Sequence, residues 1–316
     1  MTASTAPSEP VPVLKWRWIA VTAVAVAAVT GVLLWLFLAW SGRPDAPVRI
    51  DAVKTAFGVG AGAGGVFALW LATRRQRTLE VQLAETTRDL EERRVTELYT
   101  KAVEQLGSDK APVRLGGLYA LERLGQDNPK QRQTIVNVWC AYLRMPFKPP
   151  AGGLKGNAAR DLADDPGESE LLVRLAVQEL LKTHLSRDAP GCWPGMSVDL
   201  QRATLVDFRL SGCTLAAADF SRARFVGQLH IRGTHFAHQA GFYGAEFRDI
   251  ANFDRSVFEE GAFFSRAHFA RDVRFTGIRS GGRFEFPRAV FAEGADFDGG
   301  EHQELDLTDA QFPEAG

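Results

Sequence analysis

Phenylalanine recurs at fixed intervals through the last third of this sequence, and no other feature constrains the fold as strongly. A small or slim residue, most often alanine, stands two positions before nearly every member of the pattern. Such regularity predicts a stacked repeat structure. Two interleaved series and an upstream run at intervals of five make up the pattern: Ile231, Phe242, Phe253, Phe264, Phe275, Phe286 and Phe297; Phe225, Phe236, Phe247, Phe258 and Phe269; Leu200, Leu205, Leu210, Leu215 and Phe220.

An interval of five excludes an amphipathic helix, whose apolar positions fall three and four apart, and a long strand, which alternates without a break. Residues two apart point to the same side of an extended segment, so each small residue and the Leu or Phe after it face inward together. A short extended face followed by a corner fits this spacing. Four such faces close a coil of roughly 20 to 22 residues, and coils stacked about 4.8 Å apart pair their backbones.

Two segments, ADFSR at residues 218–222 and ATLVD at 203–207, resemble the A(D/N)LXX pentapeptide repeat. The resemblance covers residues 198–312 and implies a right-handed quadrilateral β-helix. Ser280 stands where the pattern expects a ring. Because the steps after Phe225 alternate between five and six, we expect a bulged corner in each half coil.

The amino end predicts a membrane anchor. After a disordered N-terminus (1–15), residues 16–72 are expected to form two transmembrane helices, 18–40 and 55–72, the first long enough to cross a bilayer and the second rich in glycine. A cleaved signal peptide is the alternative for the first. Basic residues flank the pair, which places both ends in the cytoplasm. The expected localisation is thus the cell membrane, as a multi-pass protein with a cytoplasmic C-terminal domain and the lipid bilayer as a partner.

The middle of the chain is expected to be helical. We predict a juxtamembrane helix (73–107), a helical hairpin (108–146), a flexible linker (147–169) and a capping helix (170–190) that seals the first coil. The blocks TELYTKAVEQLG (96–107) and VRLGGLYALERL (113–124) resemble the segment between anchor and repeats in actinobacterial pentapeptide-repeat membrane proteins. A homodimer through the juxtamembrane helix or the C-terminal end of the β-helix is left open. The fold class is therefore α+β multidomain.

Stacking the coils predicts one candidate site. If coils begin at Leu200, Phe220, Phe242, Phe264 and Phe286, the same corner carries four arginines, a basic edge able to meet acidic groups or phosphates. These are Arg202, Arg222, Arg266 and Arg288, with Gly244 between the second and third. In the alternative interpretation the acidic residues three positions earlier, Asp199, Asp219 and Glu285, neutralise the edge.

The sequence predicts no catalytic, cofactor-binding or metal-binding residues. It contains no phosphate-binding glycine loop with lysine, no zinc spacing and no nucleophile elbow. The three cysteines, Cys140, Cys192 and Cys213, have no metal or disulfide spacing, which favours a reducing compartment. His230, His235 and His238 are close in sequence, but the pattern places the first two on outward positions of different faces, where they cannot converge on one ion.

These observations predict that the repeat domain is a scaffolding or protein-interaction surface with an unknown protein partner, and not an enzyme. A DNA mimic that modulates a topoisomerase is the first alternative, since the repeat family includes proteins that protect DNA gyrase in this way. From residue 198 to 316 there are 18 acidic residues against 13 arginines, but 8 of the acids lie from Glu293 onward. That balance disfavours a polyanion mimic, and no nucleic-acid partner is expected. The second alternative is an enzyme site in the helical middle near Tyr99, Glu104 and Arg123.

Overall fold

The structure, a computed structural model, describes residues 46–150 and 166–313 and scattered positions between 21 and 39. The predicted disordered N-terminus, most of the predicted span 18–40 and linker residues 151–165 lie outside the described residues. Two compact units divide the chain, Met1–Glu91 and Glu92–Gly316. The domain boundaries given above stay predictions.

Helix α2 (Ala46–Leu106) runs for 61 residues without a break and includes the predicted second span. In the part of the chain that the structure describes, no helix combines the length and the apolar character needed to cross a bilayer. The predictions of two transmembrane helices and of a multi-pass membrane localisation are therefore wrong. Glycine supplies no apolar side chain, and five of the eight residues at 58–65 are glycines, so this stretch is less apolar than the sequence interpretation assumed.

The second unit begins with the end of α2 and continues with α3 (Ala111–Asp127), the 3-10 turn η1 (Pro129–Gln131), α4 (Arg132–Arg144) and α6 (Pro166–Leu185). Each of these helices buries an apolar stripe, and the stripes share one core with the first coil of the repeats. Two positions of α3 require glycine because neighbouring atoms lie too close for a side chain. A Cβ on Gly117 would lie 2.6 Å from the Ala102 carbonyl oxygen, and one on Gly125 would lie 2.5 Å from the Trp193 ring.

A buried arginine ties α6 to the end of α4. Arg174 is 3% exposed. Its Nε donates to Glu170 at 2.7 Å, and its two terminal nitrogens donate to the carbonyl oxygens of Leu143 and Met145 at 2.9 and 2.8 Å. These carbonyls belong to the last turn of a helix, where no helical N–H group is left to bind them, so the guanidinium acts as a C-terminal cap.

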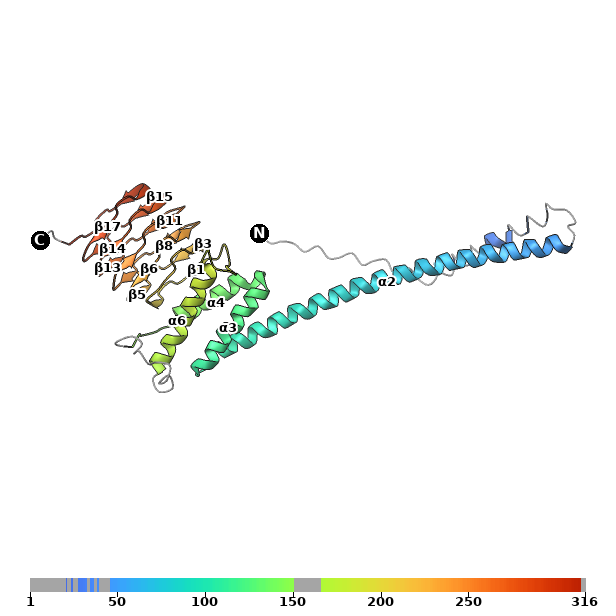
Figure 1. Cartoon of the computed structure of the whole chain (residues 1–316), viewed down its shortest axis with the longest axis horizontal. Helices are drawn as coiled ribbons and strands as arrows, with labels where there is room; N and C mark the ends of the chain where they lie inside the picture. Colours follow the sequence, from blue (N-terminus) through green and yellow to red (C-terminus); the bar gives the residue numbers. More distant parts are fainter. Residues whose placement is uncertain are drawn as a thin grey trace. The chain divides into compact units, whose positions relative to one another are not determined.

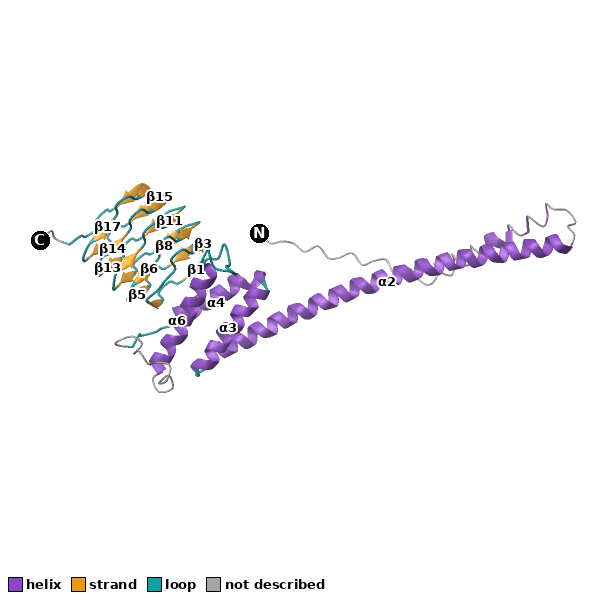
Figure 2. Cartoon of the chain, in the orientation of Figure 1, coloured by secondary structure: helices purple, strands orange, loops and turns teal. Residues whose placement is uncertain are grey.

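The repeats form a four-sided β-solenoid in which every strand pair is parallel (Figures 1 and 2). Register partners on one face are first 20 residues apart, Val198 and Ala218, and then 22 apart, Ala218 and Ala240. Face 1 comprises β1 (Val198–Asp199), β4 (Ala218–Asp219), β8 (Ala240–Gly241) and β12 (Ala262–Phe263); face 2 β2 (Thr204–Val206), β5 (Arg224–Val226), β9 (Glu246–Phe247), β13 (His268–Phe269) and β16 (Val290–Phe291); face 3 β6 (Leu229–His230), β10 (Ala251–Asn252), β14 (Val273–Arg274) and β17 (Ala295–Asp296); and face 4 β3 (Thr214–Leu215), β7 (His235–Phe236) and β11 (Val257–Phe258).

Stacked rings fill the interior, as the sequence predicts. Phe242, Phe253, Phe264 and Phe275 are all 0% exposed. Rings on one face lie parallel between successive coils, with centroids 4.5 Å apart for Phe242 and Phe264, while rings on opposite faces meet edge to face, as at 5.4 Å for Phe253 and Phe264. Both arrangements are favourable for aromatic quadrupoles and add to the free energy gained by burial.

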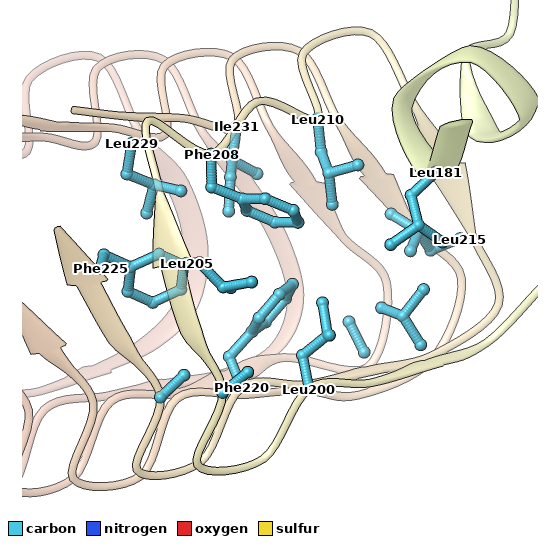
Figure 3. Close-up of a cluster of buried hydrophobic side chains, with 14 of the residues drawn as sticks. Leu181, Leu200, Leu205, Phe208, Leu210, Leu215, Phe220, Phe225, Leu229 and Ile231 are labelled. Atoms are coloured by element: carbon cyan, nitrogen blue, oxygen red, sulfur yellow. The ribbon is translucent and has the colours of Figure 1, made fainter. Parts of the chain in front are cut away.

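The first coil is filled mainly by leucines, with Phe208 as its one phenylalanine, and α6 lies against it. Figure 3 shows Leu200, Leu205, Leu210 and Leu215 pointing into the core, with Leu181 of α6 beside Leu215. Polar contacts also join helix and coil: the Gln178 amide donates to the Val206 carbonyl oxygen at 2.8 Å and accepts from the Val206 N–H at 3.2 Å. The side chain thus satisfies backbone groups that have no coil above them.

One corner is missing from the later coils. Strand β15 (Arg279–Glu285) runs straight from face 4 into face 1, and β18 (Glu301–Asp306) pairs along it. The phenylalanine absent at Ser280 is replaced by Phe284, which is fully buried and lies 5.9 Å from Phe258. A ring from the adjoining face therefore fills the space, and the interior stays packed.

Candidate interaction surface

Two diagonally opposite corners of the solenoid share one backbone conformation. At the corner between faces 1 and 2 the φ angles lie between 56° and 61°, and the residues there, called the arginine corner below, are Arg202, Arg222, Gly244, Arg266, Arg288 and Asp309. The N–H of each of the first five donates to a carbonyl oxygen of the next coil, at 2.7 to 2.9 Å. The structure therefore places the four predicted arginines in a single column.

The opposite corner, between faces 3 and 4, makes the same backbone hydrogen bonds at 2.8 to 2.9 Å. Its φ angles lie between 57° and 71°. Its residues, called the glycine corner below, are Gly212, Gly233, Arg255, Gly277 and Gly299. A left-handed φ costs an L-residue roughly 1–2 kcal/mol and costs glycine nothing sterically. Arginine at four of six positions on the other corner is thus not what the backbone prefers.

Three of the predicted arginines lack an acidic partner. Within residues 46–150 and 166–313, no ion pair involves Arg202, Arg222 or Arg266, and all three are exposed. Arg288 pairs with Asp309 of the next coil at 3.7 Å. The column therefore carries positive charge that is available to a partner at three of its four arginines.

The acidic residues expected to neutralise this column bind elsewhere. Asp199 forms an ion pair with Arg144 of α4. Asp219 accepts from the Ser221 N–H at 2.8 Å and from the Gln201 amide at 2.7 Å. Glu285 lies 3.5 Å from Arg283. Each carboxylate thus has a partner other than the arginine three residues after it.

An aromatic residue in the column was missed by the sequence analysis. Tyr243 lies in the coil between two arginines, and the Cζ atoms of Arg222 and Arg266 are each 5.9 Å from its ring centroid. The ring is partly exposed and holds both guanidiniums by cation–π attraction, worth about 0.5–1 kcal/mol each at an exposed site. Gly244 beside it leaves room for the Arg222 side chain, whose Cγ lies 3.6 Å from the position of an added Cβ. The repeat pattern itself contained the signal, since Tyr243 precedes the one corner position without a side chain.

The other sequence candidates do not converge. His235 and His238 bind separate carboxylates, Glu259 at 2.9 Å and Glu260 at 2.8 Å, and His230 contacts Gln228. No group of three or more possible metal ligands occurs among the residues that the structure describes. Burial raises the pKa of the Cys140 and Cys213 thiols to about 12, so neither is a thiolate at neutral pH.

The helical middle holds a polar cluster at a different place from the predicted one. Tyr99, Glu104 and Arg123 line neither of the two cavities described in the structure. Instead, His184 is buried, stacks on Trp193 at 4.2 Å and contacts Glu122 at 3.0 Å. Glu122 is 62 residues from His184 in the sequence, so spacing alone could not have joined the two.

Comparison with protein families identifies the coils. A family profile described as pentapeptide repeats (9 copies) matches residues 242–290, and one described as pentapeptide repeats (8 copies) matches residues 196–227. A four-sided solenoid with these matches is a pentapeptide-repeat structure, and the chain carries pentapeptide repeats in this part of its sequence. A search of curated proteins found no match, and a search of solved structures found none. The family matches do not extend to residues 96–107 and 113–124, so the actinobacterial resemblance stays a prediction.

Proposed function

We propose that the solenoid is a protein-interaction surface whose arginine corner binds a partner segment carrying regularly spaced carboxylates. The observation that carries this proposal is the retention of unpaired arginines at a conformation that favours glycine. Backbone strain that persists at an exposed position points to a use for the side chain. Guanidinium groups repeated along the stack match carboxylates geometrically, because each can bind in a bidentate manner.

The solid interior supports binding at the outside of the solenoid and gives no support to catalysis within it. Side chains fill the axis, and every phenylalanine from Phe208 to Phe286 except Phe263 is buried. Ligand sites in proteins are concave and enclosed, whereas the arginine corner is a convex edge. Such an edge suits recognition by a second protein that supplies the complementary groove or strand.

The DNA-mimic alternative is less well supported. A polyanion mimic needs an acidic surface, but this corner is basic and the acidic residues beside it are already paired. Inhibition of a purified topoisomerase by the full chain, abolished by neutralising the acidic residues from Glu293 onward, would favour that alternative.

Binding of a fluorescent poly-L-glutamate peptide, followed by anisotropy at low salt, tests the proposal. The double variant R222G/R266G is expected to weaken binding at least tenfold, because each charge-assisted hydrogen bond contributes about 1.5–3 kcal/mol and 1.4 kcal/mol is a factor of ten. Glycine suits this corner, so the variant is expected to fold.

The matched control is R224Q/R271Q, which removes the same charge from arginines that already pair with Glu246 and Glu293. It is expected to change the affinity less than threefold. An equal loss in both double variants would show that only net charge matters, and no loss in R222G/R266G would overturn the role of the corner.

A further inference from the structure

A groove lies along face 4 and the glycine corner, separate from the arginine corner. Its volume is about 940 Å³. Its floor follows one column through successive coils, from His235 through Val257 and Arg279 to Glu301, which are register partners. The floor of the groove is therefore built into the repeat.

Glycines line this hollow. They are Gly233, Gly281 and Gly300, and no side chain projects into the groove from these positions. Gly281 is required, because a Cβ there would lie 2.5 Å from the Glu259 carbonyl oxygen. Strand β15 thus lines the groove with Arg279, Ser280 and Gly281, while Phe284 on the same strand is buried in the interior.

Three guanidiniums reach this groove from different parts of the chain. Arg187 follows α6 and donates to the Gly233 carbonyl oxygen at 3.4 Å. Arg255 comes from the glycine corner, and Arg279 comes from β15. No ion pair involves any of the three in the described parts of the chain. Arg279 and Glu301 are register partners, yet no ion pair joins them, whereas the register partners Arg224 and Glu246 pair at 3.0 Å.

Arg255 is the most informative of the three. Among the described residues it is the one position of the glycine corner that is not glycine, and its φ of 57° is the strained left-handed value. The coils before and after it carry Gly233 and Gly277, so its side chain has free space on both sides, and its Cγ lies 3.8 Å from the position of a Cβ on Gly277. A charged residue at this position carries the cost of the strain and gains no partner within the chain.

Two carboxylates also line the groove. Glu259 is held by His235 at 2.9 Å, and Glu301 lies at the far end beside His302. With neutral imidazoles, three arginines against two glutamates leave a net charge of +1. The groove therefore carries a net positive charge, which Arg187, Arg255 and Arg279 supply.

From these observations we propose that the groove binds a small ligand with two or more phosphate groups. Guanidinium forks match phosphate oxygens in a planar, bidentate way, and three of them can serve more than one phosphate. The volume falls within the range of about 300–1,000 Å³ that is typical of small-molecule sites. This site is independent of the arginine corner, and either proposal can fail without the other.

Isothermal titration of the full chain with sodium tripolyphosphate tests the site. R255G and R279Q are each expected to raise the Kd at least tenfold. R255G also relieves a strained φ, so loss of binding in this variant cannot be attributed to unfolding if the melting temperature is maintained or raised. Orthophosphate is expected to bind at least tenfold more weakly than tripolyphosphate, because it reaches fewer guanidiniums.

The matched control is R224Q, which removes one arginine that lies outside the groove and already pairs with Glu246. It is expected to leave the Kd for tripolyphosphate within twofold of the parent chain. An equal loss in R224Q and R255G would reduce the effect to net charge and overturn the site. Absence of tripolyphosphate binding would overturn it as well. If a poly-L-glutamate peptide binds with the same dependence on Arg255, the groove is a site for an acidic protein segment, and the proposal of a phosphate ligand is overturned.

Discussion

The two corners of the solenoid have the same backbone and different residues. Both hold a left-handed φ and both donate the same hydrogen bond to the next coil, yet one is mainly arginine and the other mainly glycine. Backbone geometry alone would select glycine at both. Packing therefore fixes the residues inside the solenoid, whereas the backbone does not fix the residues at its corners.

The largest expected effect tests whether the two corners depend equally on the core. Phe264 and Phe275 are fully buried, and each stands two positions before a corner residue, Arg266 and Gly277. We expect Phe264→Ala and Phe275→Ala to lower the free energy of unfolding by similar amounts, about 3–5 kcal/mol each, because each leaves a ring-sized cavity in a stack that cannot collapse. Urea unfolding measures both.

Ile250→Ala is the control, because Ile250 is 39% exposed, and it is expected to lower the free energy of unfolding by less than about 1 kcal/mol. A loss under about 1 kcal/mol for Phe275→Ala, together with a large loss for Phe264→Ala, would contradict the equivalence of the two corners.

A smaller effect of opposite sign concerns strain. Arg255→Gly is expected to raise the free energy of unfolding by about 0.5–1 kcal/mol, since relief of a strained φ exceeds the entropy cost of glycine. Arg222→Gly is expected to raise the free energy of unfolding by a smaller amount, because this variant also removes a cation–π contact with Tyr243. Thermal and urea unfolding of the two variants measure the difference.

Two further variants isolate the contribution of the backbone conformation. Arg255→Ala keeps the strained φ and is expected to leave the free energy of unfolding unchanged. Gly277→Ala adds a methyl group where the nearest heavy atom is Arg255 Cγ at 3.8 Å, so no steric clash is expected. The variant is expected to lower the free energy of unfolding by about 1 kcal/mol, and this loss comes only from the left-handed φ. A stabilising Gly277→Ala would show that the corner conformation carries no strain.

The interior of the solenoid could be predicted from the sequence because packing leaves little choice. A ring that leaves water at every fifth or sixth residue can only point inward, and the small residue before it marks the same face. The column of Arg202, Arg222, Arg266 and Arg288 followed from counting along the same repeat. These features depend on spacing within one segment, and spacing is what a sequence displays.

Contacts between distant segments could not be predicted in this way. Tyr243 lies between two arginines that are 44 residues apart, and Asp199 pairs with Arg144 from another element. The Phe284 ring fills the space left by the ring that is absent at Ser280, and predicting this required knowledge that β15 runs straight through a corner. The membrane prediction failed for a different reason: residues 55–72 were interpreted by composition, and the glycines that suggested close helix packing do not add apolar surface.

The smallest expected effect contrasts a paired arginine with the unpaired ones of the corner. A hydrogen bond from Arg224, with a smaller contribution from Arg248, lowers the pKa of Glu246 below its ordinary value of 4.5. A carboxylate with a lowered pKa in the folded state stabilises the protein above pH 4.5, and this contribution is lost as the pH falls through the folded-state pKa. Because Glu246 is nearly half exposed, solvent screens the interaction, and the change in stability is expected to be small.

Titration of the Glu246 side-chain carbonyl by NMR should show its pKa rising toward 4.5 in Arg224→Gln and staying lowered in Arg222→Gln. A rise in both variants would mean that the corner arginines already act on this carboxylate through space, and the corner could then no longer be treated as a column of unpaired charges.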